Sequence, residues 1–238
     1  AVAFETNGRG YMGFLRDYPG AFVRGKTLEE ALSKVEHEVK IYQKWLGLCA
    51  NQDIIPEVIQ VHKSSLMVED GDNEILLDAD KGKLDQKEFE TLVDLVIRSG
   101  KSTFEIFSNA GFKDWIDKDM DRKTFYGNTP KTIREIFDHI NSVHYYYLSR
   151  INIYISDPKK DFLEGRNLCV SEITALFHKE GNSRIYNIDN EEWTIKKVLR
   201  RFIWHDRIHS KSMMKILKKQ KESGIIDSYS DPFCFFME

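Results

Sequence analysis

Residues 193–213 read WTIKKVLRRFIWHDRIHSKSM, and the expected form of the C-terminal part follows from this stretch. Its apolar residues recur at helical spacing, which predicts one helix over residues 192–222 that ends before Gly224. His205 and His209 continue the apolar stripe of that helix, whose other members are Ile195, Val198, Phe202, Met213 and Ile216. We therefore expect both imidazoles to point into the protein rather than into water.

The spacing His205-x-x-x-His209 is typical of a metal site on a helix. Four residues make slightly more than one helical turn, so both rings leave the same face and can bind one divalent ion. A third ligand is expected from a facing helix, and the helix predicted over residues 129–151 offers His139 and His144. Helical periodicity alone does not choose between these two. The alternative is a pair of core histidines hydrogen-bonded to backbone or tyrosine groups.

Four helices are expected in all, over residues 84–109, 129–151, 170–179 and 192–222. The second of them is expected to begin at Thr129-Pro130, because threonine is a favoured N-cap and proline is tolerated at the first helical position. The aromatic tail is expected to fold back onto these helices, with Trp193 and Trp204 in the core.

The last helix is strongly basic, with ten Lys and Arg residues and a single acid, Asp206, between residues 196 and 221. Such a helix could contact phosphates. Aromatic residues do not alternate with the basic ones, however, so nucleic acid is not expected as a partner. We expect these charges to form a solvated face opposite the apolar stripe.

Charge and pattern both change near residue 80. Residues 1–80 contain 8 Lys+Arg and 14 Asp+Glu, a net −6, whereas residues 81–238 contain 27 and 24, a net +3. The two parts are therefore expected to be separate domains, over residues 1–80 and 81–238.

The first domain is expected to combine strands with one helix. Alternating residues on both sides of Asp17-Tyr18-Pro19-Gly20 predict a β-hairpin. The pair Thr27 and Glu30 predicts a capping box at the start of a helix that runs to about residue 46. Further strands are expected at residues 57–61 and around 66–68.

The bulk composition is globular, with 41% apolar and 31% charged residues and a net charge of −3. No apolar run approaches the ~20 residues that would span a bilayer, and the N-terminus lacks a signal-peptide pattern. The cysteines, Cys49, Cys169 and Cys234, form no CxxC pair and are expected to be buried reduced thiols. We therefore expect a cytoplasmic protein with no membrane partner.

Residues 11–32, YMGFLRDYPGAFVRGKTLEEAL, resemble the start of HicB-type domains, in which two strands joined by a Pro-Gly turn precede a helix that opens with T-x-E-E-A. HicB proteins are antitoxins that often carry a separate DNA-binding segment. The sequence shows no such segment, so the resemblance implies the fold and not the antitoxin role.

A second resemblance covers the helical part. Residues 132–148, TIREIFDHINSVHYYYL, and residues 193–213 resemble the second and last helices of the DinB superfamily. The family pattern places a histidine two positions after an apolar residue in the second helix, which is His139 here, and H-x-x-x-H in the last, which falls on His205 and His209. His144 stands where many relatives have an acidic residue. The resemblance therefore implies a metal site on His139, His205 and His209.

Together the two resemblances imply an α+β two-domain fold, a small HicB-like α/β domain followed by a DinB-like antiparallel four-helix bundle. They further imply a metal-dependent transferase or hydrolase, in which zinc, nickel or iron activates a thiol or water and a low-molecular-weight thiol serves as cofactor. A small-molecule substrate and a homodimer are the partners considered. The alternative is a non-catalytic interaction or scaffold protein that senses metal or stress.

Overall fold

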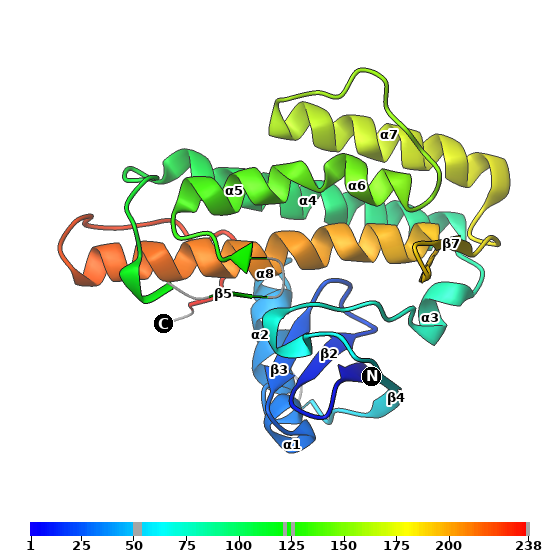
Figure 1. Cartoon of the computed structure of the whole chain (residues 1–238), viewed down its shortest axis with the longest axis horizontal. Helices are drawn as coiled ribbons and strands as arrows, with labels where there is room; N and C mark the ends of the chain where they lie inside the picture. The colour runs from blue at the N-terminus through cyan, green and yellow to red at the C-terminus, as the bar shows by residue number, and fades with distance from the viewer. Residues whose placement is uncertain (50–53, 121–122, 125–126, 237–238) are drawn as a thin grey trace.

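The computed structural model describes residues 1–49, 54–120, 123–124 and 127–236. The fold is mixed α+β, with a four-stranded sheet on one side of a layer of long helices (Figure 1). Strands β1 (Val2–Thr6), β2 (Tyr11–Leu15), β3 (Phe22–Gly25) and β4 (Val58–Lys63) lie in the order β3-β2-β1-β4. Strand β1 pairs antiparallel with β2 and parallel with β4.

The predicted hairpin is confirmed as β2 and β3, which pair with Phe14 opposite Phe22. Strand β1 was not expected, because all five of its residues are buried and they show no alternation of polar and apolar types. The strand expected around residues 66–68 is wrong. The chain there forms the 3-10 helix η1 (Val68–Asp70), which ends at Gly71 in the left-handed conformation.

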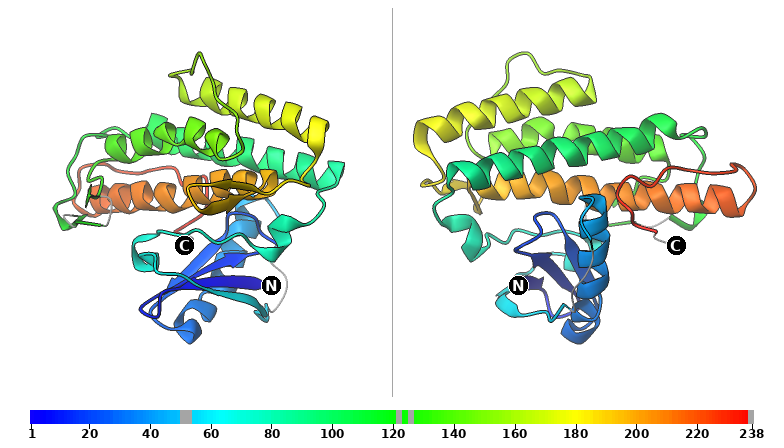
Figure 2. Two further views of the ribbon diagram at one scale, coloured as in Figure 1. Left: turned by 45° about the vertical axis from the view of Figure 1, so that its right-hand side comes forward. Right: turned by 180° about the vertical axis from the view of Figure 1, so that it is seen from behind.

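The helix predicted after the hairpin begins as expected but is interrupted. The Thr27 hydroxyl accepts a hydrogen bond from the Glu30 amide at 3.2 Å. The helix stops after one turn, however, so that α1 (Leu28–Leu32) and α2 (Val35–Trp45) are separate elements. Helix α2 rises from the sheet toward the long helices, as the rear view in Figure 2 shows.

The helical part contains α4 (Gln86–Asn109), α5 (Ile133–Ser142), α6 (His144–Ser149), α7 (Phe162–Glu180) and α8 (Ile195–Glu222). The start predicted at Thr129-Pro130 is wrong. The N-cap is Thr132, whose side chain and that of Glu135 form a reciprocal capping box. The predicted single helix is also broken at Val143, which separates α5 from α6.

Two further differences concern helix α7 and the segment between α7 and α8. Helix α7 starts at Phe162, earlier than predicted, because the Asp161 carboxylate caps the amides of Leu163 and Glu164. A short hairpin, β7 (Tyr186–Ile188) and β8 (Glu191–Trp193), leads into α8 and was not expected. The smaller elements are α3 (Asp78–Lys81), η2 (Lys118–Met120), β5 (Lys123–Thr124) and β6 (Gly127–Asn128).

Helix α8 lies at the centre of the molecule. It packs against α4, α5 and α6 on one side, while the sheet lies on its other side and α7 lies farthest from the sheet (Figures 1 and 2). The Trp204 side chain packs on the sheet, 6.2 Å between ring centroids from Phe14. Residues of both predicted domains share one large apolar core, and the division at residue 80 stays a prediction.

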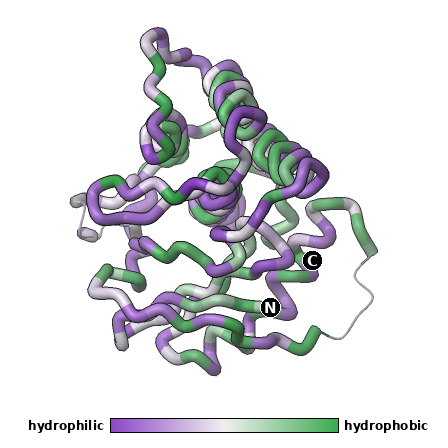
Figure 3. Tube along the Cα trace, turned by 90° about the vertical axis from the view of Figure 1, so that its right-hand side faces the viewer, coloured by the Kyte–Doolittle hydropathy of each residue, from purple (hydrophilic) through white to green (hydrophobic). Residues whose placement is uncertain are grey.

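The expectation of a solvated basic face on α8 is wrong for four of its cations. Lys197, Arg200, Arg201 and Arg207 are buried. Hydrophilic and hydrophobic positions alternate along the helices in Figure 3. The buried cations bond to polar groups that lie elsewhere in the chain: Lys197 to Glu191 at 2.9 Å, Arg200 to Asp80 at 2.6 Å, Arg207 to Glu38 at 2.7 Å, and Arg201 to Asn73.

The expectations for aromatic residues are confirmed. Trp193 and Trp204 are buried, and the tail folds back onto the helices: the Phe233 ring centre lies 5.6 Å from the Arg207 guanidinium of α8, and the Ser230 hydroxyl donates to Glu105 of α4 at 2.7 Å. Among the cysteines, Cys169 is buried and Cys234 partly so, but Cys49 is exposed, which contradicts the expectation. No described helix combines the length and apolar character that crossing a membrane requires.

Candidate metal centre

The structure brings His139, His205 and His209 together. His139 lies in the last turn of α5, which packs alongside α8. The two α8 rings lie 4.3 Å apart between centroids, and the His139 ring lies 5.0 Å from His205 and 4.6 Å from His209. One ring nitrogen of each histidine lies within 4.8 Å of the other two. Among the described residues, no cysteine or carboxylate joins this group.

His144, the competitor that periodicity left open, lies elsewhere. Its Nε2 accepts a hydrogen bond from Arg166 Nε at 3.0 Å, and its ring packs on Phe162 at 4.9 Å between centroids. Burial, together with the nearby Arg166 charge, lowers the pKa of His144 to about 2. His144 is therefore a neutral core histidine, and the structure places His139 beside the His205-x-x-x-His209 pair instead.

The three clustered imidazoles are neutral at pH 7. Burial lowers the pKa of His139 and lowers that of His209 to about 3. Burial is also the main cause that lowers the pKa of His205 well below its ordinary value, with the neighbouring His209 and His139 adding to it. A neutral imidazole has a lone pair on one nitrogen, so each ring can bind an ion in the tautomer that turns this lone pair toward the ion, in place of the 3.2 Å hydrogen bond between His139 Nε2 and His205 Nε2.

The donor set fits a divalent ion. Three ligands at ~2.1 Å from a tetrahedral ion stand about 3.4 Å apart. The Nε2 atoms of His139 and His205 are 3.2 Å apart. Imidazole nitrogens suit zinc, nickel and iron alike. The Nδ1 atom of His205 is buried and has no hydrogen-bond partner among the described residues, so no second group fixes the tautomer of this ring.

Two aromatic rings pack beside His205. The Tyr147 ring meets the His205 ring edge-on at 5.9 Å, and the Trp204 ring lies 6.2 Å from it. Tyr147 is buried, and burial raises its pKa to about 12. Its neighbour Tyr146 is 43% exposed, as expected for three consecutive tyrosines that cannot all face inward.

His209 forms part of the wall of a cavity of about 380 Å³. The cavity lies between α8, the end of β3, the start of α2 and the segment at Thr129 and Pro130. Sequence reasoning missed this feature, because its walls come from residues far apart in the chain that show no common motif.

A buried ion-pair network includes Asp206, the residue that follows His205 in α8. The Arg166 guanidinium contacts both carboxylate oxygens of Asp206, at 2.7 and 2.8 Å, and the Ser99 hydroxyl donates to Asp206 at 2.6 Å. Gly100 makes room for the guanidinium, since a Cβ there would come within 3.1 Å of Arg166 Nη1. The one available signal was that Asp206 is the only acid among the ten cations of residues 196–221.

A second group of possible ligands, Glu5, His62 and Glu74, lies at the edge of the sheet. The Glu5 carboxylate already accepts hydrogen bonds from the backbone amides of Glu74 and Ile75. His62 lies 3.7 Å from the Glu74 carboxylate. Because the Glu5 carboxylate already has backbone partners and the His62 and Glu74 side chains are 41% and 40% exposed, this group fits a metal ion less well than the three histidines do.

No protein-family model, curated protein or solved structure matches this chain. The resemblances to DinB and HicB proteins therefore stay predictions that depend on the quoted segments alone.

Proposed function

We propose that this chain is a metal-dependent enzyme that holds one divalent ion on His139, His205 and His209. The observation that carries the proposal is the meeting of three neutral imidazoles from two helices, with their ligand atoms within 4.8 Å of one another. The DinB-like segments support the same three residues independently of the geometry.

Three protein ligands leave at least one coordination position for a nucleophile or substrate, which is the form of a catalytic rather than a closed structural site. A divalent ion there would polarise a carbonyl, lower the pKa of a bound water or hold a thiol as thiolate. The thiol is the nucleophile that the DinB resemblance favours. The proposed reaction is thus transfer of a thiol to an electrophile, or a related hydrolysis.

The protein's own residues have separate roles in this proposal. The capped helix α5 and the central helix α8 orient the three rings. Tyr147 of α6 and Trp204 of α8 pack beside His205 and help to bury its ring. The cavity beside His209 has the size of a small-molecule site, for which about 300–1,000 Å³ is usual.

Elemental analysis of protein purified without chelators tests the metal site. We expect about one zinc, nickel or iron ion per chain, and a loss of at least tenfold in metal content for His205→Ala. The matched control is His178→Ala on α7, because His178 is exposed and distant in sequence from the cluster. Equal metal content in His205→Ala and the wild type would remove the proposed ligand set.

Activity is tested on the metal-loaded protein with two reactions, conjugation of a thiol to a chromogenic aryl halide and hydrolysis of a nitrophenyl ester. The proposal predicts a metal-dependent rate in one of them that His205→Ala abolishes and His178→Ala retains. A protein that binds the ion but accelerates neither reaction supports the sensor or scaffold alternative.

A further inference from the structure

The cavity beside the three histidines is lined by an excess of cations. Arg24 and Lys34 lie on the wall formed by the N-terminal part, and Lys211 and Lys215 lie on the wall formed by α8. The acidic residues that line the cavity are Glu38 and Asp70.

One of these two acids is already neutralised from outside the cavity. Glu38 accepts a hydrogen bond from Arg207 at 2.7 Å, and both side chains are buried, with 4% and 0% of their surface exposed. Arg207 does not line the cavity. The lining holds four cations and two acids, and Glu38 is already bonded to Arg207, so the potential inside the cavity is positive even with Glu30 beside Lys34.

Lys211 differs from its neighbour across the cavity. The ammonium of Lys34 donates to Glu30 at 2.6 Å and to the backbone carbonyl of Arg24 at 2.7 Å. Lys211 is partly buried, and its ammonium lies 5.9 Å from the Phe22 ring centre and 5.6 Å from that of Phe235. It makes no hydrogen bond or ion pair with any residue that the structure describes. An ammonium partly withdrawn from water, with the Glu38 charge nearby but no bonded partner, is destabilised, and an anion in the cavity would offset that cost.

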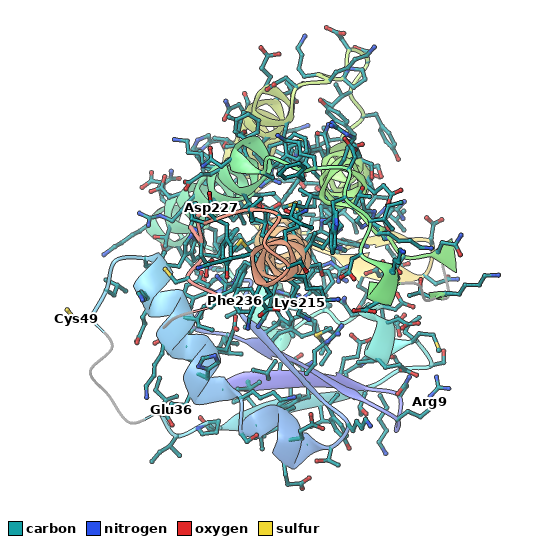
Figure 4. The ribbon with its side chains drawn as sticks, turned by 90° about the vertical axis from the view of Figure 1, so that its left-hand side faces the viewer. Arg9, Glu36, Cys49, Lys215, Asp227 and Phe236 are labelled. Carbon is teal, nitrogen blue, oxygen red and sulfur yellow. The ribbon has the colours of Figure 1, made fainter. Side chains whose placement is uncertain are left out.

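We propose that this cavity binds an oxyanion of the substrate, a carboxylate or a phosphate group, through Lys211 and Lys215 of α8 and Lys34 of the opposite wall. The inference rests on the proposed function in one respect: it places the other end of the substrate at the ion that His139, His205 and His209 would hold. Figure 4 shows Lys215 on the side of α8 that faces the N-terminal part, as binding across the cavity requires. The substrate class is accordingly a small organic anion, and its recognition uses both parts of the chain.

The test uses the full chain loaded with Co²⁺, whose absorption changes when a ligand enters its coordination sphere. Three probes of one length are titrated: glutarate, 4-phosphonobutyrate, and monomethyl glutarate, in which one carboxylate is masked. We expect the two dianionic probes to bind at least tenfold more tightly than the monoester, and Lys211→Gln to remove about tenfold of that affinity, since a hydrogen bond to a charged group contributes at least this much. Tighter binding of the phosphonate assigns a phosphate group, and tighter binding of glutarate assigns a carboxylate.

The matched control is Lys218→Gln, which removes the same charge from α8 at a site that is 51% exposed and outside the cavity. Equal affinity for glutarate and its monoester, or an equal loss in Lys211→Gln and Lys218→Gln, overturns the inference while leaving the metal site intact. If the protein holds no cobalt, the proposed function fails. The anion site is then tested by isothermal titration of glutarate into metal-free wild type, Lys211→Gln and Lys218→Gln, with weaker binding expected for Lys211→Gln alone.

Discussion

Replacing Asp206 by leucine tests whether its buried ion pair with Arg166 holds α8 in position. The Asp206 and Arg166 side chains are only 1% and 2% exposed. The substitution removes two charge-assisted hydrogen bonds of 2.7 and 2.8 Å from the guanidinium, and Ser99 loses the acceptor that it reaches at 2.6 Å. Among the described residues, Arg166 then keeps hydrogen bonds to His144 Nε2 and to the Val96 carbonyl, neither of which is charged.

The expected cost follows from the charge that remains. Removing one partner of a buried pair leaves an uncompensated charge away from water, and such losses are about 3–5 kcal/mol in the free energy of unfolding. A protein of this kind has a total of roughly 5–15 kcal/mol. We therefore expect Asp206→Leu to lower the urea midpoint strongly, measured by far-ultraviolet circular dichroism with an unchanged dependence on urea concentration. The double variant with Arg166→Met removes the stranded charge and is expected to recover most of the loss.

An exposed pair of similar geometry supplies the control. Arg134 contacts both oxygens of Asp114 at 2.7 and 3.0 Å, but the two side chains are 49% and 68% exposed. Asp114→Ala is expected to leave the urea midpoint almost unchanged, because solvent screens the pair. The reasoning is refuted if Asp206→Leu costs no more than Asp114→Ala, or if adding Arg166→Met recovers nothing.

Two further perturbations give independent tests. Metal-free protein is expected to lose stability as the pH falls below about 6.5. The histidines of the unfolded chain are protonated below that pH, whereas burial holds the pKa values of His144 and His209 in the folded protein at about 2 and about 3. Fully buried His144 alone lowers the free energy of unfolding by roughly 1.4 kcal/mol per pH unit, and a urea midpoint that stays constant from pH 7 to 5 contradicts this. Gly20→Ala is expected to cost about 2–4 kcal/mol, since Gly20 has a φ of +84° and a Cβ there would lie 2.4 Å from Ile203. Gly47→Ala, at a φ of +75° with nothing within 4 Å, isolates the backbone cost of about 1–2 kcal/mol, and equal urea midpoints for the two variants speak against the steric argument.

Local signals in the sequence predicted the elements that depend on local chemistry. The Asp-Tyr-Pro-Gly turn predicted the β2–β3 hairpin, and the Thr27 capping box predicted the start of α1. The start of α5 was misplaced because two threonines, Thr129 and Thr132, both precede the apolar run. Only Thr132 has a glutamate three residues later that completes a reciprocal cap.

The histidine cluster was predictable in part for the same reason. The His205-x-x-x-His209 spacing fixes a shared face on one helix without any knowledge of the rest of the fold. Periodicity could not choose His139 over His144, because it assumes an unbroken helix and the helix is interrupted at Val143, and because the choice depends on how α5 and α6 pack against α8 and α7. The cavity depends on how the sheet docks on α8, so its cations could not be grouped from sequence.

The buried cations of α8, which the sequence did not predict, also explain why the two parts of the chain pack together. A helix with ten cations would be unstable in an apolar core by itself, because buried charges need partners. Two acids from the N-terminal part, Glu38 and Asp80, bond to Arg207 and Arg200 and so allow α8 to lie between the sheet and the other helices. The same docking places the cations of that part across the cavity from His209. The N-terminal part therefore completes both the core around α8 and the wall of the candidate site.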